Sequence, residues 1–358
     1  MRRLHLVAVA LAGIAIAGLA AAAWRDRARV RHLALPVLVD PSAPPTSAVP
    51  LAEGPPCAAV EVARVGGRVT AVLETGDHEL WIGTFDRGVL RPGEDGLAPE
   101  PVAGLAGREL LVNALVEHDG LVWAATQGGL VAFDGERRAL ALLAGDAVAA
   151  LAVAGGSLYA GTGRGLFRVT VDEGAERVDV AGPSGEPVRP TALAASAGRL
   201  WIGTASGVYA LPLPSLDAPL LARTARWHPL VFGEPPAETN VVTALAPLAD
   251  GAVAGTDDGG LALVRADGRV SAARFDDPRA NAVSPGAAAV AAGAVLAGTQ
   301  GGGVLAARAG SAGLEIARLG GIGRLDVSAI SAAPGGALVG TADGAVLRIS
   351  CAGAVPAS

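Results

Sequence analysis

Side chains that could do chemistry are sparse in this chain. Beyond the first 32 residues the sequence contains three histidines, His78, His118 and His228, and its two cysteines are Cys57 and Cys351. Imidazole groups bind metal ions or transfer protons when carboxylates lie within reach, and a cysteine pair forms a disulfide in an oxidising compartment. Which of these reactions the protein could perform depends on the secondary-structure elements that position these residues.

Two of the histidines occupy equivalent turns in neighbouring repeats. A metal site at His78 and His118 would need a third ligand, and the candidates are Asp77, Glu117 and Asp119. The spacing between repeats is expected to keep these groups too far apart. We therefore interpret both histidines as solvated turn residues.

Other polar patterns also favour structural roles. The acidic pairs Asp257-Asp258 and Asp276-Asp277 lack the spacing of a calcium loop and are typical of turns. Paired glycines are explained by hairpins and need no phosphate-binding loop. From these residues we expect no metal, no cofactor and no catalytic group.

The elements are set by a repeat that recurs seven times. Each copy is an apolar run that ends in Gly-Thr or a near variant, then a Gly-rich turn and a second apolar run. The copies begin at Leu80, Val122, Leu158, Leu200, Ala252, Val295 and Ala337, with a period near 42 residues. A strand-turn-strand unit of that period predicts the blades of a β-propeller. Continuous hydrophobicity along each run indicates that both faces of each strand are covered.

A further strand precedes each Gly-Thr strand and is expected to be innermost in its blade. These strands begin at Val69, Val112, Val148, Pro190, Val242 and Val327, and the sixth copy, around Pro285 to Ala288, is degenerate. The sequence therefore predicts an all-β, seven-bladed propeller of four-stranded blades.

The last repeat supplies three strands, so its fourth is expected to come from the N-terminal side, at Cys57 to Val65. That arrangement closes the ring by pairing the N-terminal strand with the last blade. It also places Cys57 beside Cys351, which predicts a disulfide if the compartment is oxidising. The alternative is two unrelated buried thiols.

The N-terminal 32 residues read as a signal peptide or a membrane anchor. Arg2 and Arg3 precede an apolar stretch from Leu6 to Trp24, and four arginines follow by position 31. Because basic residues prefer the cytoplasmic side, a tethered form is favoured over a cleaved one. Residues 33–56 read as a Pro-rich linker, 57–351 as the propeller and 352–358 as a C-terminal tail.

The charge balance excludes one class of partner. The chain has 28 basic and 34 acidic residues, and the N-terminal 32 hold six arginines and one aspartate, so the rest is still more acidic. An acidic domain is a poor nucleic-acid binder.

The blade sequence resembles the two-component regulator propeller repeat. The resemblance lies in LWIGT at Leu80 to Thr84 and at Leu200 to Thr204, and in TNVVTAL from Thr239 to Leu245, and it covers Cys57 to Cys351. In that family the propellers are commonly extracytoplasmic sensor parts of large histidine kinases, often as two rings followed by a β domain and a kinase. The resemblance implies a sensor role, and one ring is expected here.

Two groups of surface residues are candidates for ligand or partner binding. The longest spacing between repeats carries Arg226, Trp227, His228 and Phe232, where aromatic and arginine side chains could form a recognition patch. The alternative places Trp227 on an outer strand and Phe232 over the core. A second set precedes the inner strands, around the predicted channel mouth, and consists of Arg68, Asp146, Arg189, Asn240 and Asp326.

The sequence thus predicts a non-catalytic binding module, a sensor or an interaction scaffold for an unknown protein or small ligand. We expect a monomeric propeller in the bacterial periplasm or at the cell exterior, anchored to the inner membrane by its N-terminal helix or secreted if that helix is cleaved. The alternative is a propeller enzyme, a lyase or glycan hydrolase, in which Asp146, Asp326 and His228 would converge at the channel mouth.

Overall fold

The described part of the chain folds mainly into β-strands. The computed structural model describes residues 48–93, 98–180, 185, 187–196, 198–213, 225–228, 230, 241–310 and 313–351. Within this part the helical elements are a 3-10 helix, η1 (Gly107–Leu110), and one turn of helix, α2 (Pro278–Asn281). The predicted all-β class is therefore confirmed.

Five sheets have four antiparallel strands each, and within each sheet the strands follow chain order. The first two contain β2 (Val69–Glu74), β3 (Leu80–Thr84), β4 (Val89–Pro92) and β5 (Pro99–Pro101), and β6 (Val112–His118), β7 (Leu121–Thr126), β8 (Gly129–Asp134) and β9 (Arg137–Leu142). The next two contain β10 (Val148–Ala154), β11 (Ser157–Thr162), β12 (Gly165–Thr170) and β13 (Gly174–Val178), and β14 (Ala192–Ser196), β15 (Arg199–Thr204), β16 (Gly207–Pro212) and β17 (Arg226–His228). The fifth contains β18 (Val242–Leu248), β19 (Gly251–Thr256), β20 (Leu261–Arg265) and β21 (Val270–Ala273).

An eight-stranded sheet holds the last two repeats and the N-terminal strand, in the order β22-β23-β24-β25-β1-β28-β27-β26. Its strands are β1 (Ala52–Arg64), β22 (Val283–Ala291), β23 (Ala294–Thr299), β24 (Gly303–Ala309), β25 (Leu314–Gly320), β26 (Val327–Ala333), β27 (Gly336–Thr341) and β28 (Ala345–Cys351). The C-terminal half of β1 pairs antiparallel with β28, with Cys57 opposite Cys351, and a disulfide joins these two cysteines. This is the pairing that the sequence predicts.

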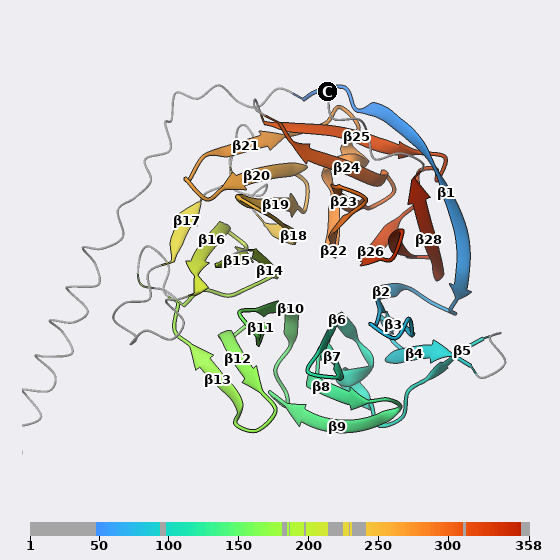
Figure 1. The fold of residues 1–358 in the computed structure, drawn as a ribbon, viewed down its shortest axis with the longest axis vertical. Coiled ribbons are helices and arrows are strands. Elements are labelled where there is room, and N and C mark those ends of the chain that lie inside the picture. Colours follow the sequence, from blue (N-terminus) through green and yellow to red (C-terminus); the bar gives the residue numbers. More distant parts are fainter. Residues whose placement is uncertain are drawn as a thin grey trace, which may run out of the picture.

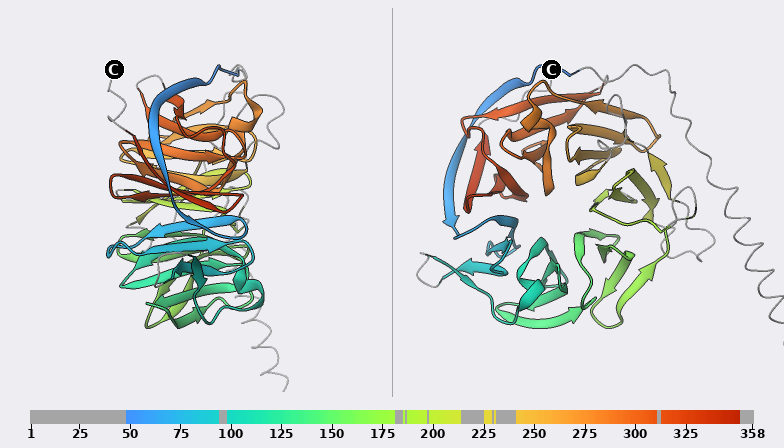
Figure 2. Two further views of the ribbon diagram at one scale, coloured as in Figure 1. Left: turned by 90° about the vertical axis from the view of Figure 1, so that its right-hand side faces the viewer. Right: turned by 180° about the vertical axis from the view of Figure 1, so that it is seen from behind.

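Figure 1 shows the sheets arranged around a common centre, with the first strand of each repeat next to it. The view from behind in Figure 2 shows the same arrangement, with β1, in blue, running along the outside of the strands that it joins. We call the end of the sheets at which the innermost strands begin the top face, and the residues before β2, β10, β14 and β26 mark it.

Neighbouring sheets cover both faces of the Gly-Thr strands. In β15 the side chains of Leu200 and Ile202 belong to one buried cluster, whereas Trp201 belongs to the next. All three residues are fully buried. The continuous apolar runs therefore reflect sheet-on-sheet packing on two sides, as expected from the sequence.

The glycine of each Gly-Thr pair makes room for the next sheet. A Cβ at Gly83 would lie 2.6 Å from Cγ1 of Val112, the residue that begins β6, and a Cβ at Gly340 would lie 2.4 Å from Cγ1 of Val69, which begins β2. No real Cβ approaches so closely, so any larger residue would push two sheets apart.

The threonine of the pair closes the hairpin that follows. The hydroxyl of Thr84 donates to the carbonyl oxygen of Gly88 at 2.8 Å and accepts from the amide of Arg87 at 2.9 Å. Thr126, Thr162, Thr204, Thr256, Thr299 and Thr341 make the corresponding donated bond in their own turns. The motif that dominates the sequence is therefore structural.

Two boundaries differ from prediction. The first strand begins at Ala52, inside the segment predicted as linker, because Ala52 and Glu53 pair in parallel with β25. Its Pro55 and Pro56 suggested a linker, but an edge strand accommodates proline where no ladder bond is required of it. The predicted N-terminal segment, the start of the linker and the tail at 352–358 lie outside the described residues.

The sixth inner strand lies where its degenerate copy was predicted, but it starts earlier. It begins at Val283, which pairs with Thr299, and the next pair is Ala288 with Ala297. The residues between them, Ser284 to Ala287, lie opposite Gly298 alone. The segment is thus an ordinary inner strand that carries a wide bulge at Pro285-Gly286, where Gly286 has a φ of 70°.

Candidate functional site

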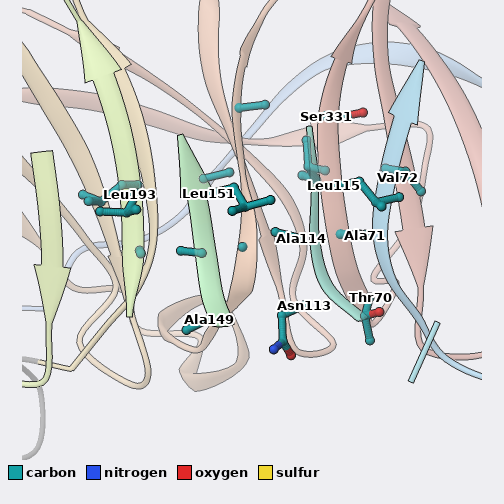
Figure 3. Close-up of a pocket in the computed structure, with 18 of the residues that line it drawn as sticks. Thr70, Ala71, Val72, Asn113, Ala114, Leu115, Ala149, Leu151, Leu193 and Ser331 are labelled. Carbon is teal, nitrogen blue, oxygen red and sulfur yellow. The ribbon is translucent and has the colours of Figure 1, made fainter. Parts of the chain in front are cut away.

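A cavity of about 260 Å³ lies at the centre of the sheets, between the innermost strands. Its wall consists of small and aliphatic side chains, including Leu115, Leu151 and Leu193, which Figure 3 shows projecting from neighbouring strands. At one end the wall carries polar side chains, among them Thr70 and Asn113. Central cavities of this kind are common ligand sites.

The polar residues near this end also tie the sheets together. The side-chain amide of Asn113 donates to the carbonyl oxygen of Val148 at 2.7 Å. The hydroxyl of Ser328 donates to the carbonyl oxygen of Val69 at 2.5 Å. Thr191 and Thr243 make the same kind of bond to Val242 and Val283. In each case the acceptor is the first residue of the following inner strand.

The top face surrounds this end of the cavity. Arg68 and Arg189 are exposed there, and neither makes an ion pair with a described residue. Asp146 forms an ion pair with Arg164, so that carboxylate is neutralised. Asp326 is exposed, and its backbone accepts a bond from Ala342.

An exposed aromatic residue stands beside one of these arginines. Phe85 follows the first Gly-Thr pair, its amide donates to the carbonyl oxygen of Arg68 at 3.1 Å, and 56% of it is exposed. The sequence analysis passed over Phe85, since it treated the residues after Gly-Thr as turn formers. The signal available in the sequence was a phenylalanine in a turn of a chain with few aromatic residues.

The predicted patch around the longest spacing is not assembled as expected. Arg226, Trp227 and His228 form the outer strand β17, and Arg226 donates to the backbone oxygen of Asp267 at 3.1 Å. His228 is 1% exposed, so the prediction that it contacts a partner is wrong. Phe232 and Asn240 lie outside the described residues.

The buried position of His228 also sets its protonation state. Burial lowers the pKa of His228 to about 4, and the nearby Arg226 adds to this, against a weaker opposing interaction with the backbone of Gly268. Its ring lies 6.4 Å from that of Trp201, measured between centroids. His228 is therefore a neutral core residue at neutral pH.

The structure does not bring together the three groups that the enzyme alternative requires. Asp146 precedes β10 and Asp326 precedes β26, both on the top face, whereas His228 is buried in the outermost strand β17. The convergence of Asp146, Asp326 and His228 at the channel mouth is therefore a wrong prediction.

The histidines of the equivalent turns pair with carboxylates. Nδ1 of His78 lies 3.1 Å from Oε1 of Glu74, and Nε2 of His118 lies 3.2 Å from Oδ2 of Asp119. Glu117 accepts a bond from the amide of Gly76 at 2.7 Å, which links the two turns. Within the described part of the chain no group of His, Cys, Asp and Glu is arranged to hold a metal ion.

The acidic pairs have different environments. Asp277 caps α2 by accepting from the amide of Arg279 and forms ion pairs with Arg318 and Arg324. Asp257 lies in a top-face turn, where its amide donates to the carbonyl oxygen of Val241 at 3.1 Å.

Comparison with known proteins yields structural likeness alone. No protein-family model matches the chain, and no curated protein matches its sequence. Virginiamycin B lyase from Staphylococcus aureus is similar in structure, with a TM-score of 0.61 and 12% identity, over 83% of this chain and 99% of that one.

Two extracellular-domain structures from B. thetaiotaomicron are also similar. The extracellular domain described as that of the hybrid two-component system BT4673 gives a TM-score of 0.60 at 16% identity, over 82% of this chain and 39% of that one. The corresponding domain of BT3049 gives 0.59 at 16% identity, over 83% and 42%. The chain thus spans about two fifths of the length of these domains. At such identities the likeness shows a shared fold, consistent with a β-propeller.

Proposed function

We propose that this chain is a non-catalytic, extracytoplasmic binding module that engages a protein partner through its top face. The observation that carries the proposal is the exposed Phe85 beside Arg68, with Arg189 on the same face. An aromatic anchor next to arginine is the combination enriched where proteins bind one another. Because neither arginine forms an ion pair with a described residue, the matching surface would present carboxylates around an apolar pocket.

The domain that we propose is a closed ring of seven blades related to the two-component regulator propellers. In this interpretation the eight-stranded sheet is two blades joined by β1. The approach of Val69 to Gly340 and the bond from Ser328 to Val69 support closure, because they join the last repeat to the first. The likeness to the extracellular two-component domains supports the family and the location.

The location also draws support from the disulfide, since disulfides persist in oxidising compartments. Among the described residues no helix has the length and apolar character to cross a membrane. The predicted anchor before residue 33 lies outside that part, so tethering by the N-terminal segment remains part of the proposal.

A lyase-like enzyme is the second candidate. It is favoured by the likeness to virginiamycin B lyase over nearly the whole length of that protein. Because His228 is buried in an outer strand, it cannot join Asp146 and Asp326 in the catalytic group that the sequence suggested for this enzyme.

Photocrosslinking in the cells that make the protein tests the proposed interface. A photoreactive phenylalanine analogue at Phe85 is compared with the same analogue at Val171, which is 46% exposed in the turn between β12 and β13. We expect a crosslinked product from position 85 that is absent from position 171 and is lost when Arg68→Glu is added. Equal products from both positions, no product, or a product that is unaffected by Arg68→Glu would contradict the top-face interface.

A further inference from the structure

A segment of β22 reaches across the central cavity at its top-face end. The bulge in β22 places Gly286 so that a Cβ there would lie 3.8 Å from the carbonyl oxygen of Asn113 in β6. β22 and β6 belong to different sheets that are not neighbours around the centre in Figure 1. The Pro285-Gly286 bulge therefore covers part of this end, which we call the floor, and we call the cavity the cup.

The floor of the cup carries hydrogen-bond donors. The hydroxyl of Thr70 is buried and has no hydrogen-bond partner among the described residues. The side-chain amide of Asn113 uses one N–H on Val148, and its oxygen accepts from Gln127 at 3.3 Å, which leaves its second N–H available. Figure 3 shows Asn113 and Thr70 at the same end of the cavity. An unpaired buried donor costs stability, and a ligand that supplies an acceptor would remove that cost.

The wall above the floor is uncharged and mostly apolar, apart from the hydroxyl of Ser331 at the end opposite Thr70. Among the described residues that line the cavity none is ionisable, and most are alanine, leucine, valine or isoleucine. A charged ligand would lose its hydration here without gaining a counter-ion. The cavity volume of about 260 Å³ lies below the usual range for drug-sized ligands.

We propose that this cup binds a small, uncharged molecule with a compact hydrocarbon body and one oxygen acceptor, a carbonyl or hydroxyl group, which receives hydrogen bonds from Thr70 and Asn113. The hydrocarbon body packs against Leu115, Leu151 and Leu193. This site is distinct from the protein-binding surface at Phe85 and Arg68, because neither residue lines the cavity. A negative result for one of the two proposed sites therefore does not contradict the other.

Cyclohexanone is a suitable probe, with cyclohexylammonium and cyclohexanecarboxylate as charged controls of the same ring size. Saturation-transfer NMR on the full chain in detergent measures the binding of each. We expect cyclohexanone to bind with a dissociation constant in the millimolar range and the two charged analogues to bind at least tenfold more weakly.

Matched variants locate the binding. Ala149→Phe fills the cup from β10, and Ala59→Phe makes the same change on the exposed side of β1. We expect the first to abolish binding and the second to leave it unchanged. Ala289→Leu, which reduces the cup from another strand, is the second filling variant if Ala149→Phe fails to fold. Thr70→Val should weaken binding about three- to tenfold, the worth of one hydrogen bond, whereas Thr70→Ser should restore it.

The inference is overturned if cyclohexanone fails to bind the wild-type chain. It is equally overturned if a folded filling variant binds as well as wild type, or if the charged analogues bind as well as the ketone. Equal affinity of wild type and Thr70→Val would contradict the assigned role of the floor.

Discussion

Val69 occupies the space that a side chain at Gly340 would need. Their contact joins the first residue of β2 to the second strand of the last repeat, across a separation of nearly the whole domain. A Cβ at Gly340 would lie 2.4 Å from Cγ1 of Val69, and the hydroxyl of Ser328 donates to the carbonyl oxygen of Val69 at 2.5 Å. The first and last repeats therefore pack through the same glycine–valine approach and the same kind of hydrogen bond as consecutive repeats do.

Substitution of this glycine should destabilise the domain. We expect Gly340→Ala to lower the free energy of unfolding by about 1–3 kcal/mol, the usual cost of overpacking. Gly163→Ala is the matched control, because a Cβ there would meet nothing within 4 Å. Chemical denaturation of both variants, and of Gly340→Ala combined with Val69→Ala, measures the effect. Equal stability of the two single variants, or no rescue by Val69→Ala, would show that the contact is not tight.

A buried arginine holds the N-terminal strand. Arg318 is 4% exposed and forms ion pairs with Glu53 at 2.9 Å and Asp277 at 2.5 Å, and its Nε donates to the backbone oxygen of Gly302 at 2.8 Å. Replacing Arg318 breaks both ion pairs and leaves the largely buried carboxylate of Asp277 with Arg324 as its remaining described counter-ion.

We expect Arg318→Met to lower the free energy of unfolding by about 3 kcal/mol and to expose residues near Glu53 to limited proteolysis. Arg269→Met removes an ion pair whose arginine side chain is 76% exposed, and it should change stability by less than about 0.5 kcal/mol. Similar losses in the two variants would mean that Arg318 does not fix β1.

The buried imidazole of His228 predicts a pH dependence. Because burial lowers its pKa to about 4 from its ordinary value of 6.5, the unfolded chain binds a proton on this residue before the folded chain does. The stability that the neutral ring contributes is present above pH 6.5 and falls between pH 6.5 and 4. Arg226, Arg199 and Asp267 act on the same ring, and the two arginines favour its neutral form.

The difference in unfolding free energy between wild type and His228→Gln isolates this residue from the carboxylates that titrate nearby. We expect the difference to change across pH 6.5 to 4 and to be constant between pH 7 and 8. Curves that run parallel over the whole range would place the pKa of His228 near its ordinary value.

Much of the fold was predictable because its determinants are local and repeated. The Gly-Thr pairs mark the second strand of most repeats, and a valine is the first residue of most inner strands. The disulfide followed from counting strands, because a three-stranded last repeat required a partner at Cys57. Seven repeats are counted from the sequence, and the seven-bladed closed ring remains our proposal.

The wrong predictions concern features that the repeated sequence pattern does not encode. Pro55 and Pro56 suggested a linker, so the start of β1 was not predicted. An edge strand can contain proline at positions that donate no ladder hydrogen bond. The Pro285-Gly286 insertion hid Val283 as the start of an inner strand. Phe85 was overlooked because its role depends on exposure, and His228 was misplaced for the same reason, since burial is a property of the assembled sheets.

Trapping of free thiols tests most directly whether the chain is a closed propeller that works outside the cytoplasm. In extracts denatured in the presence of a maleimide reagent, we expect Cys57 and Cys351 to resist the reagent until a reductant is added, after which both should react. Reaction of both cysteines without reductant would show that the disulfide is absent in the cell, and it would contradict the proposed location.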